Sequence, residues 1–176
     1  RSNIAVVLQD VFLFSDTIEE NIKMGQRKEL QMEAVRLAAE DAKARGFIEK
    51  MDEQYETVIG ERGVGLSGGQ KQRLALAVNL VADKDIYIFD EATSNIDIES
   101  EEIIMKNIKA LSKEKNVIVI SHRLENIVPA DRIYYLESGK VKECGNHQSL
   151  MEAKGGYAVL YRRQKELEKG YVEVSA

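Results

Sequence analysis

The chain has 176 residues, with 25 Lys and Arg against 30 Asp and Glu, so its formal net charge is −5 and its pI is near 5.3. Its 44% hydrophobic and 31% charged residues exclude a mostly disordered chain, and the acidic balance gives no support to nucleic-acid binding. The longest stretch without a charged residue, 74–82, is shorter than the roughly 20 apolar residues of a membrane-spanning helix. The single cysteine, Cys144, excludes an internal disulfide, so composition predicts a soluble, intracellular α/β or α+β domain.

Apolar runs alternate along the chain with stretches of helical spacing. The runs at residues 4–8, 86–89 and 117–120 lack polar alternation, so each predicts a strand buried on both faces. A hairpin is expected over residues 132–143, with its turn at Ser138-Gly139. Helices are expected at residues 18–22, 29–45, 47–51, 71–82, 98–111 and 147–169. This order predicts a largely parallel sheet covered on both faces.

Two acids, Asp90 and Glu91, directly follow the apolar run at residues 86–89. Open α/β sheets bind ligands at the carboxyl ends of their strands, so the pair lies where a metal or substrate would bind. Adjacent acids leave a strand in different directions, which lets one serve a metal while the other faces a substrate. The alternative reading of this pair is two solvated acids at a strand end.

The segment Leu66-Ser-Gly-Gly-Gln70 runs straight into the helix expected at 71–82. Bare backbone N–H groups, a hydroxyl and a helix N-terminus together form an anion site. An ordinary glycine loop is the alternative for such a cluster alone, but its order about twenty residues before Asp90 favours the anion site. Gln9 and His122 end the first and third apolar runs, so polar groups from three strand ends are expected to converge at one sheet edge.

These residues together resemble the ATP-binding cassette (ABC) ATPase domains. In order, the matching elements are the Q-loop, signature, Walker B, D-loop and H-loop, found here as Gln9, Leu66-Ser-Gly-Gly-Gln70, Asp90-Glu91, Asp97 and His122. The resemblance spans residue 1 to about Leu160. Six further segments resemble the exporter branch of this family in particular. They are Phe12-Leu-Phe14, Thr17-Ile-Glu-Glu-Asn-Ile22, Gly60-Glu-Arg-Gly63, Ser121-His-Arg-Leu124, Ala130-Asp-Arg-Ile133 and Gly145-Asn-His147.

The resemblance implies roles on one side of an ATP site. Asp90 would hold Mg²⁺ through water, with Gln9 as a further ligand, and Glu91 would be the general base for the attacking water. His122 would contact the γ-phosphate. The ATP held by a second domain would be gripped by Ser67, Gly68, Gly69 and Gln70, and Asp97 would link the two sites.

The sequence departs from the family pattern in two places. The D-loop, usually Ser-Ala-Leu-Asp, reads Ser94-Asn-Ile-Asp97, which changes the interface at Asn95. A P-loop requires Gly, four residues, then Gly-Lys-Ser or Gly-Lys-Thr, whereas Gly60 to Ser67 has the glycine spacing with Leu66 in place of the lysine. We therefore expect a domain truncated upstream of the Q-loop.

The implied fold is α/β: a P-loop-NTPase-like (RecA-like), mostly parallel sheet core with an inserted ABC α-helical subdomain. A partial ABC ATPase domain is expected over 1–160, with the Q-loop and helical subdomain at about 10–83 and the Walker B and H-loop core at 84–160. Residues 161–176 would form a C-terminal helix and tail.

The resemblance also implies partners and a location. These are a second ABC ATPase domain in a homodimer or heterodimer, transmembrane domains docked near the Q-loop, and the cytoplasmic face of the cell membrane, with no nucleic acid. Two alternatives stay open from the sequence: a non-transport ABC ATPase of DNA repair or translation, and a fragment that acts only as a binding or assembly module.

Overall fold

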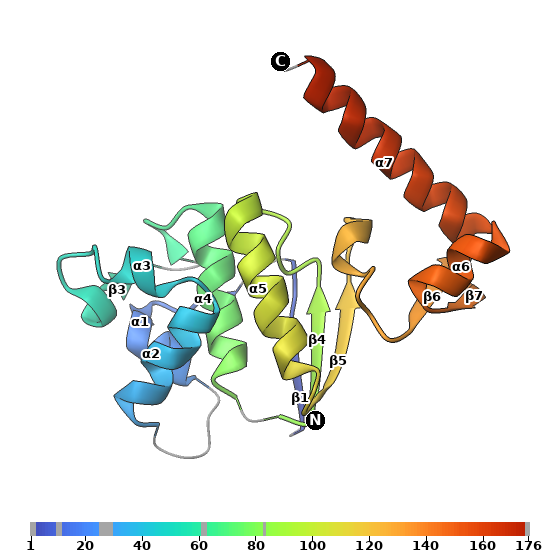
Figure 1. Ribbon diagram of the computed structural model, residues 1–176. Helices are drawn as coiled ribbons and strands as arrows, with labels where there is room; N and C mark the ends of the chain where they lie inside the picture. The colour runs from blue at the N-terminus through green and yellow to red at the C-terminus, as the bar shows by residue number, and fades with distance from the viewer. Residues whose placement is uncertain (1–2, 10–11, 25–29, 61–62, 83, 175–176) are drawn as a thin grey trace. The chain divides into compact units, whose positions relative to one another are not determined.

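The computed structural model describes residues 3–9, 12–24, 30–60, 63–82 and 84–174, with side chains as far as Leu167. Glu61 and Arg62 of the exporter-like segment at Gly60 lie outside the described residues. The chain divides into two compact units, Arg1–Ile120 and Ser121–Ala176 (Figure 1). Among the described residues, no helix combines the length and apolar character needed to cross a membrane.

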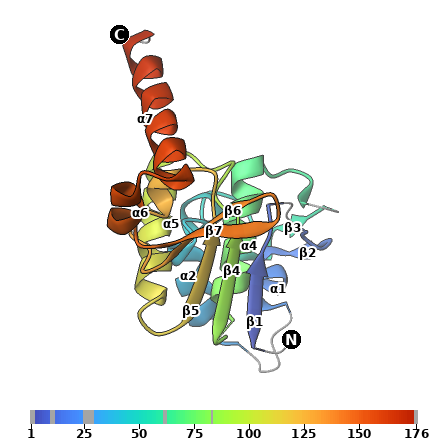
Figure 2. The same cartoon turned by 90° about the vertical axis from the view of Figure 1, so that its right-hand side faces the viewer.

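A parallel sheet forms the centre of the first unit. Its strands are β1 (Ile4–Val7), β4 (Ile86–Asp90) and β5 (Asn116–Ile120), in the order β1-β4-β5. Figure 2 shows the three strands side by side. Val7 pairs with Phe89, and Asp90 pairs with Ile120, so the carboxyl ends of the strands meet at one edge. The predicted parallel sheet core is confirmed.

Helices cover one face of this sheet. The remaining elements of the first unit are β2 (Asp16–Thr17), α1 (Ile18–Lys23), α2 (Met32–Asp41), α3 (Arg45–Ile48), a 3-10 turn (Gln54–Glu56), β3 (Val58–Ile59), α4 (Gly68–Leu80) and α5 (Ile98–Leu111). The core joins side chains of β1 and β4 to Leu74 and Leu76 of α4 and to Ile104 and Ile108 of α5. The ribbon of β2 and β3 is antiparallel.

The expectation that both faces of the sheet are covered is wrong for the described residues. Alternate residues of β1 and β4 are buried, Val7 and Phe89 among them, because they face the helices. The intervening residues of β1, the next residue Leu8 and the corresponding positions of β5 are 41–53% exposed: Ile4, Val6, Leu8, Ile118 and Ile120. The sequence pattern was apolar on both faces, but helices in this unit cover only one.

The helix expected at 29–45 is shorter in the structure. α2 ends at Asp41, because Lys43 adopts a left-handed backbone conformation with φ 56° that no continuing helix tolerates. Its buried face includes Val35, which is fully buried, whereas Leu37 is 62% exposed. A separate short helix, α3, follows at Arg45.

The second unit opens with a 3-10 turn (Leu124–Asn126) and a hairpin of β6 (Ile133–Glu137) and β7 (Lys140–Gly145). Ser138 and Gly139 have φ of 50° and 72°, the backbone of a two-residue type I′ turn, so the predicted hairpin is confirmed.

The single helix expected over 147–169 is two helices, α6 (His147–Ala153) and α7 (Gly156–Val174). Lys154 has φ 54° and ends α6. The Glu143 carboxylate of β7 then accepts hydrogen bonds from the N–H groups of Gly156 and Tyr157. Glu143 lies thirteen residues before Gly156, and the spacing of apolar residues does not show such a contact at a helix N-terminus. The sequence pattern therefore did not predict the break between α6 and α7.

Candidate functional site

The predicted acids lie at the carboxyl edge of the sheet. Asp90 is the last residue of β4, Glu91 follows it, and both are half-buried. Gln9 lies two residues beyond the end of β1 and is exposed. Because β1 and β4 are parallel neighbours paired at Val7 and Phe89, Gln9 and the two acids occupy the same edge.

The backbone of Glu91 is unusual. Its φ of 48° lies in the left-handed region, which costs a non-glycine residue roughly 1–3 kcal/mol unless surrounding contacts impose it. One such contact is its own N–H, which donates to the Ile120 carbonyl of β5 over 2.9 Å. The turn after β4 is thus fixed to the neighbouring strand at the residue that carries the second acid.

The glycine segment forms the N-terminus of α4. Ser67 is the N-cap: its Oγ accepts from the N–H of Gln70 (3.3 Å), and its own N–H donates to the Gln70 Oε1 (2.8 Å). This reciprocal capping box orients the helix start with two side chains. A Cβ at Gly68 would meet no atom of the described residues within 4 Å, so packing against those residues does not explain the glycine there.

Asp97 caps α5. Its carboxylate accepts from the N–H of Ser100 over 2.9 Å and pairs with Arg73 Nη1 over 3.2 Å. The hydrogen bond from the Ser100 N–H, aided by the Ser100 hydroxyl and by Arg73, holds the pKa of Asp97 below its usual range. Through Arg73, the Asp97 carboxylate is tied to the same helix that Ser67 begins.

His122 lies in the second unit, two residues after β5, and is exposed. It sits in a turn in which the Ser121 Oγ accepts from the N–H of Arg123 over 3.0 Å. The first unit thus brings Gln9, Asp90 and Glu91 to one edge of the sheet. His122 belongs to the second unit.

The oxygen donors at this sheet edge are of the kind that Mg²⁺ takes when it is shared with a nucleotide. Within the described ranges, no three His, Cys, Asp or Glu side chains gather as metal ligands. Mg²⁺ commonly keeps several waters and takes one or two protein oxygens together with substrate phosphates. The Asp90 carboxylate and the Gln9 amide oxygen are such donors, at one edge of the sheet.

Sequence reasoning missed two buried amides. Gln72 of α4 is 1% exposed and Asn21 of α1 is 2% exposed, and each makes several hydrogen bonds to backbone groups of neighbouring loops. For Gln72 the available signal was its position three and four residues before Ala75 and Leu76, which are buried on the same face of the helix.

Comparisons with known proteins agree with this geometry. A family model described as ABC transporter matches residues 1–94. ATP-dependent lipid A-core flippases of Haemophilus influenzae (strain 86-028NP) and Pasteurella multocida (strain Pm70) are 46% and 48% identical to this chain over 164 residues. A putative multidrug export ATP-binding/permease protein of Staphylococcus aureus (strain NCTC 8325 / PS 47) is 44% identical over 164 residues.

A solved structure of a bacterial Atm1-family ABC exporter with ATP bound is similar to 94% of this chain, with 39% sequence identity and a TM-score of 0.89. The chain spans 29% of that exporter, and the match to each flippase covers 93% of this chain and 28% of the relative. The family model covers more than half of the chain, and its matched region contains Gln9, the signature segment and the Asp90-Glu91 pair. The chain therefore belongs to the ABC transporter family.

Proposed function

We propose that this chain is the C-terminal portion of the ATP-binding domain of an ABC exporter, which in the full protein binds and hydrolyses ATP at a dimer interface to drive transmembrane export. The observation that carries the proposal is the pairing of two features: acids at the carboxyl edge of β4, and a capped glycine helix start tied to Asp97 through Arg73. Relatives named as flippases and exporters, of which the chain spans under a third, favour export over DNA repair or translation.

In this proposal Gln9, Asp90, Glu91 and His122 serve the hydrolytic step. Asp90, through water, and Gln9 would hold Mg²⁺, which would neutralise charge on the phosphates. Glu91 orients the attacking water and accepts its proton. His122 contacts the γ-phosphate and stabilises its charge as the bond breaks.

The start of α4 serves the nucleotide bound by the second domain. The first N–H groups of a helix lack partners within it and carry partial positive charge, so they bind anions. Ser67 and the N–H groups near Gly68, Gly69 and Gln70 would grip the γ-phosphate there. The open space at Gly68 supports this role, since it leaves the backbone accessible to an approaching group.

An exposed aromatic pair is the proposed contact with the transmembrane domains. Phe12 is 65% and Phe14 47% exposed, and their rings meet edge to face with centroids 4.8 Å apart. Asn21 fixes the base of this loop: its amide donates to the carbonyls of Phe14 and Thr17 (3.1 and 2.9 Å), and its Oδ1 accepts from the N–H of Phe14 (2.9 Å).

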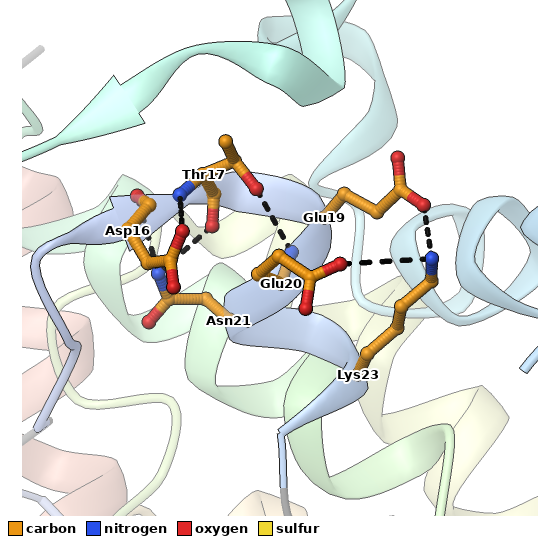
Figure 3. A network of polar contacts seen from close by, with 6 residues as sticks. All are labelled: Asp16, Thr17, Glu19, Glu20, Asn21 and Lys23. Carbon is orange, nitrogen blue, oxygen red and sulfur yellow. Dashed lines mark hydrogen bonds and ion pairs between the residues drawn. The ribbon is translucent and has the colours of Figure 1, made fainter. Parts of the chain in front are cut away.

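The turn behind the aromatic pair is held by further local contacts, shown in Figure 3. The Thr17 hydroxyl accepts from the N–H of Glu20, and Lys23 forms ion pairs with Glu19 and Glu20. A rigid support of this kind suits a surface that must transmit force to a membrane partner. In this proposal the domain lies at the cytoplasmic face of the cell membrane.

The substitution Ser67→Asp in the full-length protein tests the phosphate role of α4. Aspartate caps helices as well as serine and its charge favours a helix N-terminus, so a purely structural role predicts unchanged or higher stability. A phosphate-binding role predicts loss of ATP hydrolysis by about 10²-fold or more, because the new charge repels the γ-phosphate. The matched control Asn146→Asp adds the same charge at the N-cap of α6 and should retain full activity. Full activity of Ser67→Asp would contradict the proposal.

A further inference from the structure

A buried carboxamide on α4 holds the backbone that carries Glu91. Gln72 is 1% exposed, and its Oε1 accepts from the N–H of Asn95 over 2.9 Å. Its Nε2 donates to the Glu91 carbonyl and to the Ser94 Oγ, both over 3.3 Å. One side chain thus ties the first residue of the 91–95 turn to the last.

The donors and acceptors fix the orientation of this amide. The Asn95 N–H requires an acceptor and the Glu91 carbonyl requires a donor, so only one orientation of the Gln72 amide satisfies both. A hydrophobic side chain of similar size would fill the same space and would leave these backbone groups without the contact.

Two neighbouring positions of α4 make contact with the same segment. Gly69, Gln72 and Arg73 are spaced i, i+3, i+4, which places them on one face of the helix. At Gly69 the helix approaches so closely that an added Cβ would lie 2.9 Å from the Asn95 carbonyl oxygen. Arg73 Nη1 pairs with the Asp97 carboxylate (3.2 Å) and donates to the Ser100 hydroxyl (3.3 Å).

Arg73 is itself held by a further contact. Its guanidinium lies over the ring of Phe47, 5.6 Å from the centroid, and its side chain is 17% exposed. The face of α4 that carries these residues therefore contacts the segment from Glu91 to Ser100 at both of its ends. The left-handed backbone of Glu91, φ 48°, requires such support from its surroundings.

We propose that Gln72 is a positioning residue for ATP hydrolysis: its carboxamide sets the backbone of residues 91–95 and thereby aims the Glu91 carboxylate at the attacking water. Gln72 itself contacts neither nucleotide nor water in this proposal. The inference rests on the proposed role of Glu91 as the general base, and it adds a second residue whose loss weakens the chemical step without weakening nucleotide binding.

The test uses the full-length protein carrying Gln72→Met, a substitution of similar length that suits a helix and lacks the amide. A reacting group displaced by about 1 Å can lose about 10²-fold in rate. We expect kcat for ATP hydrolysis to fall about 10- to 100-fold while KM changes less than about twofold. Asn79→Met is the matched control, because Asn79 is an amide on the same helix that donates to the Ala75 carbonyl within α4 (2.9 Å). It should hydrolyse ATP within about twofold of the wild-type rate.

Two further measurements separate positioning from a general loss of structure. Hydrogen exchange over residues 91–97 should accelerate in Gln72→Met and stay unchanged in Asn79→Met, because the Asn95 N–H loses its acceptor only in the former. In single-turnover assays on a Glu91→Gln background, Gln72→Met should cause no additional loss, since it acts through the base already removed.

Each outcome decides the inference. Wild-type kcat in Gln72→Met, or an equal additional loss on the Glu91→Gln background, overturns the positioning role. Normal hydrolysis by Glu91→Gln alone would instead overturn the proposed function itself. If Gln72→Met does not fold, Gln72→Asn takes its place, because its amide is one methylene too short to span from Glu91 to Asn95, and the same kinetic and exchange criteria apply.

Discussion

The backbone of Gly69 lies against that of Asn95: a Cβ added at Gly69 would meet the Asn95 carbonyl oxygen at 2.9 Å. Real Cβ atoms do not approach a backbone oxygen so closely, and a backbone oxygen cannot move aside as the end of a flexible side chain can. The glycine therefore lets the N-terminal turn of α4 touch the loop between Glu91 and Asp97. A Cβ added at Gly68, one residue earlier, would meet no described atom within 4 Å.

This difference predicts opposite behaviour for two adjacent glycines. Gly69→Ala should destabilise the chain by about 1–3 kcal/mol, because either the helix or the loop must shift. Gly68→Ala should leave stability unchanged or raise it by up to about 1 kcal/mol, since alanine favours the helix. Denaturant unfolding of the two variants measures both values. Equal stabilities would show that the close approach at Gly69 is not a constraint.

A second prediction concerns the activity of the Gly68→Ala variant. In the full-length protein, Gly68→Ala should lower ATP hydrolysis although the fold is intact, because the methyl group would occupy space proposed for a γ-phosphate. Steady-state hydrolysis with purified protein is the measurement. A stable Gly68→Ala variant with wild-type turnover would contradict phosphate binding at this helix start.

Much of the fold could be predicted because local pattern and tertiary structure agree. The apolar runs became β1, β4 and β5, and Ser138-Gly139 formed the expected turn. The failures have tertiary causes. α2 stops at a left-handed Lys43, and the break before α7 depends on Glu143, a residue thirteen positions earlier than Gly156.

The site could be predicted only in part, for a related reason. Residues such as Glu91 and Ser67 stand in recognisable local motifs, so their placement at a strand end and a helix start follows from neighbouring sequence. The buried contacts of Gln72 join segments 19 to 23 residues apart. No periodicity reveals which carbonyl a buried amide will meet.

A pH-dependent contribution to stability is expected from Asp97. Its carboxyl pKa is lowered in the folded chain by the Ser100 N–H, the Ser100 hydroxyl and Arg73. A lowered folded-state pKa stabilises the fold above the unfolded value of about 3.9 and loses that effect as pH falls through the folded-state pKa. The melting temperatures of wild type and Asp97→Asn should therefore differ most above about pH 5 and converge as the pH falls below about 3.9 and through the folded-state pKa. A difference independent of pH would contradict this assignment.

The isolated 176-residue chain should self-associate through the edge of β5. Within the described residues β5 pairs with β4 and no other strand, while Ile118 and Ile120 are 51% and 49% exposed. An apolar edge without charge is a template for pairing with another chain. Ile118→Lys should shift the population towards monomer in light scattering during size-exclusion chromatography. Leu37→Lys, which charges a more exposed apolar site on α2, should not. A clean wild-type monomer at high concentration would refute the open-edge explanation.

The chain alone should also fail to bind Mg-ATP tightly. Its sequence contains no P-loop pattern, the element whose lysine and backbone N–H groups hold most phosphate contacts. Calorimetric titration of the 176-residue chain with Mg-ATP should detect no micromolar binding. A micromolar affinity would show that this chain forms a nucleotide site without a P-loop.

Hydrolysis by Glu91→Gln in the full-length protein is the most direct test of the proposed function. The substitution keeps the size of the side chain and removes the base that would accept a proton from water. We predict a loss in the ATP hydrolysis rate of about 10²- to 10⁴-fold or somewhat more, with ATP binding preserved. The exposed acid Glu102 of α5 provides the control Glu102→Gln, which should hydrolyse ATP normally. Near wild-type hydrolysis by Glu91→Gln would contradict the assignment of the general base and of the site built around it.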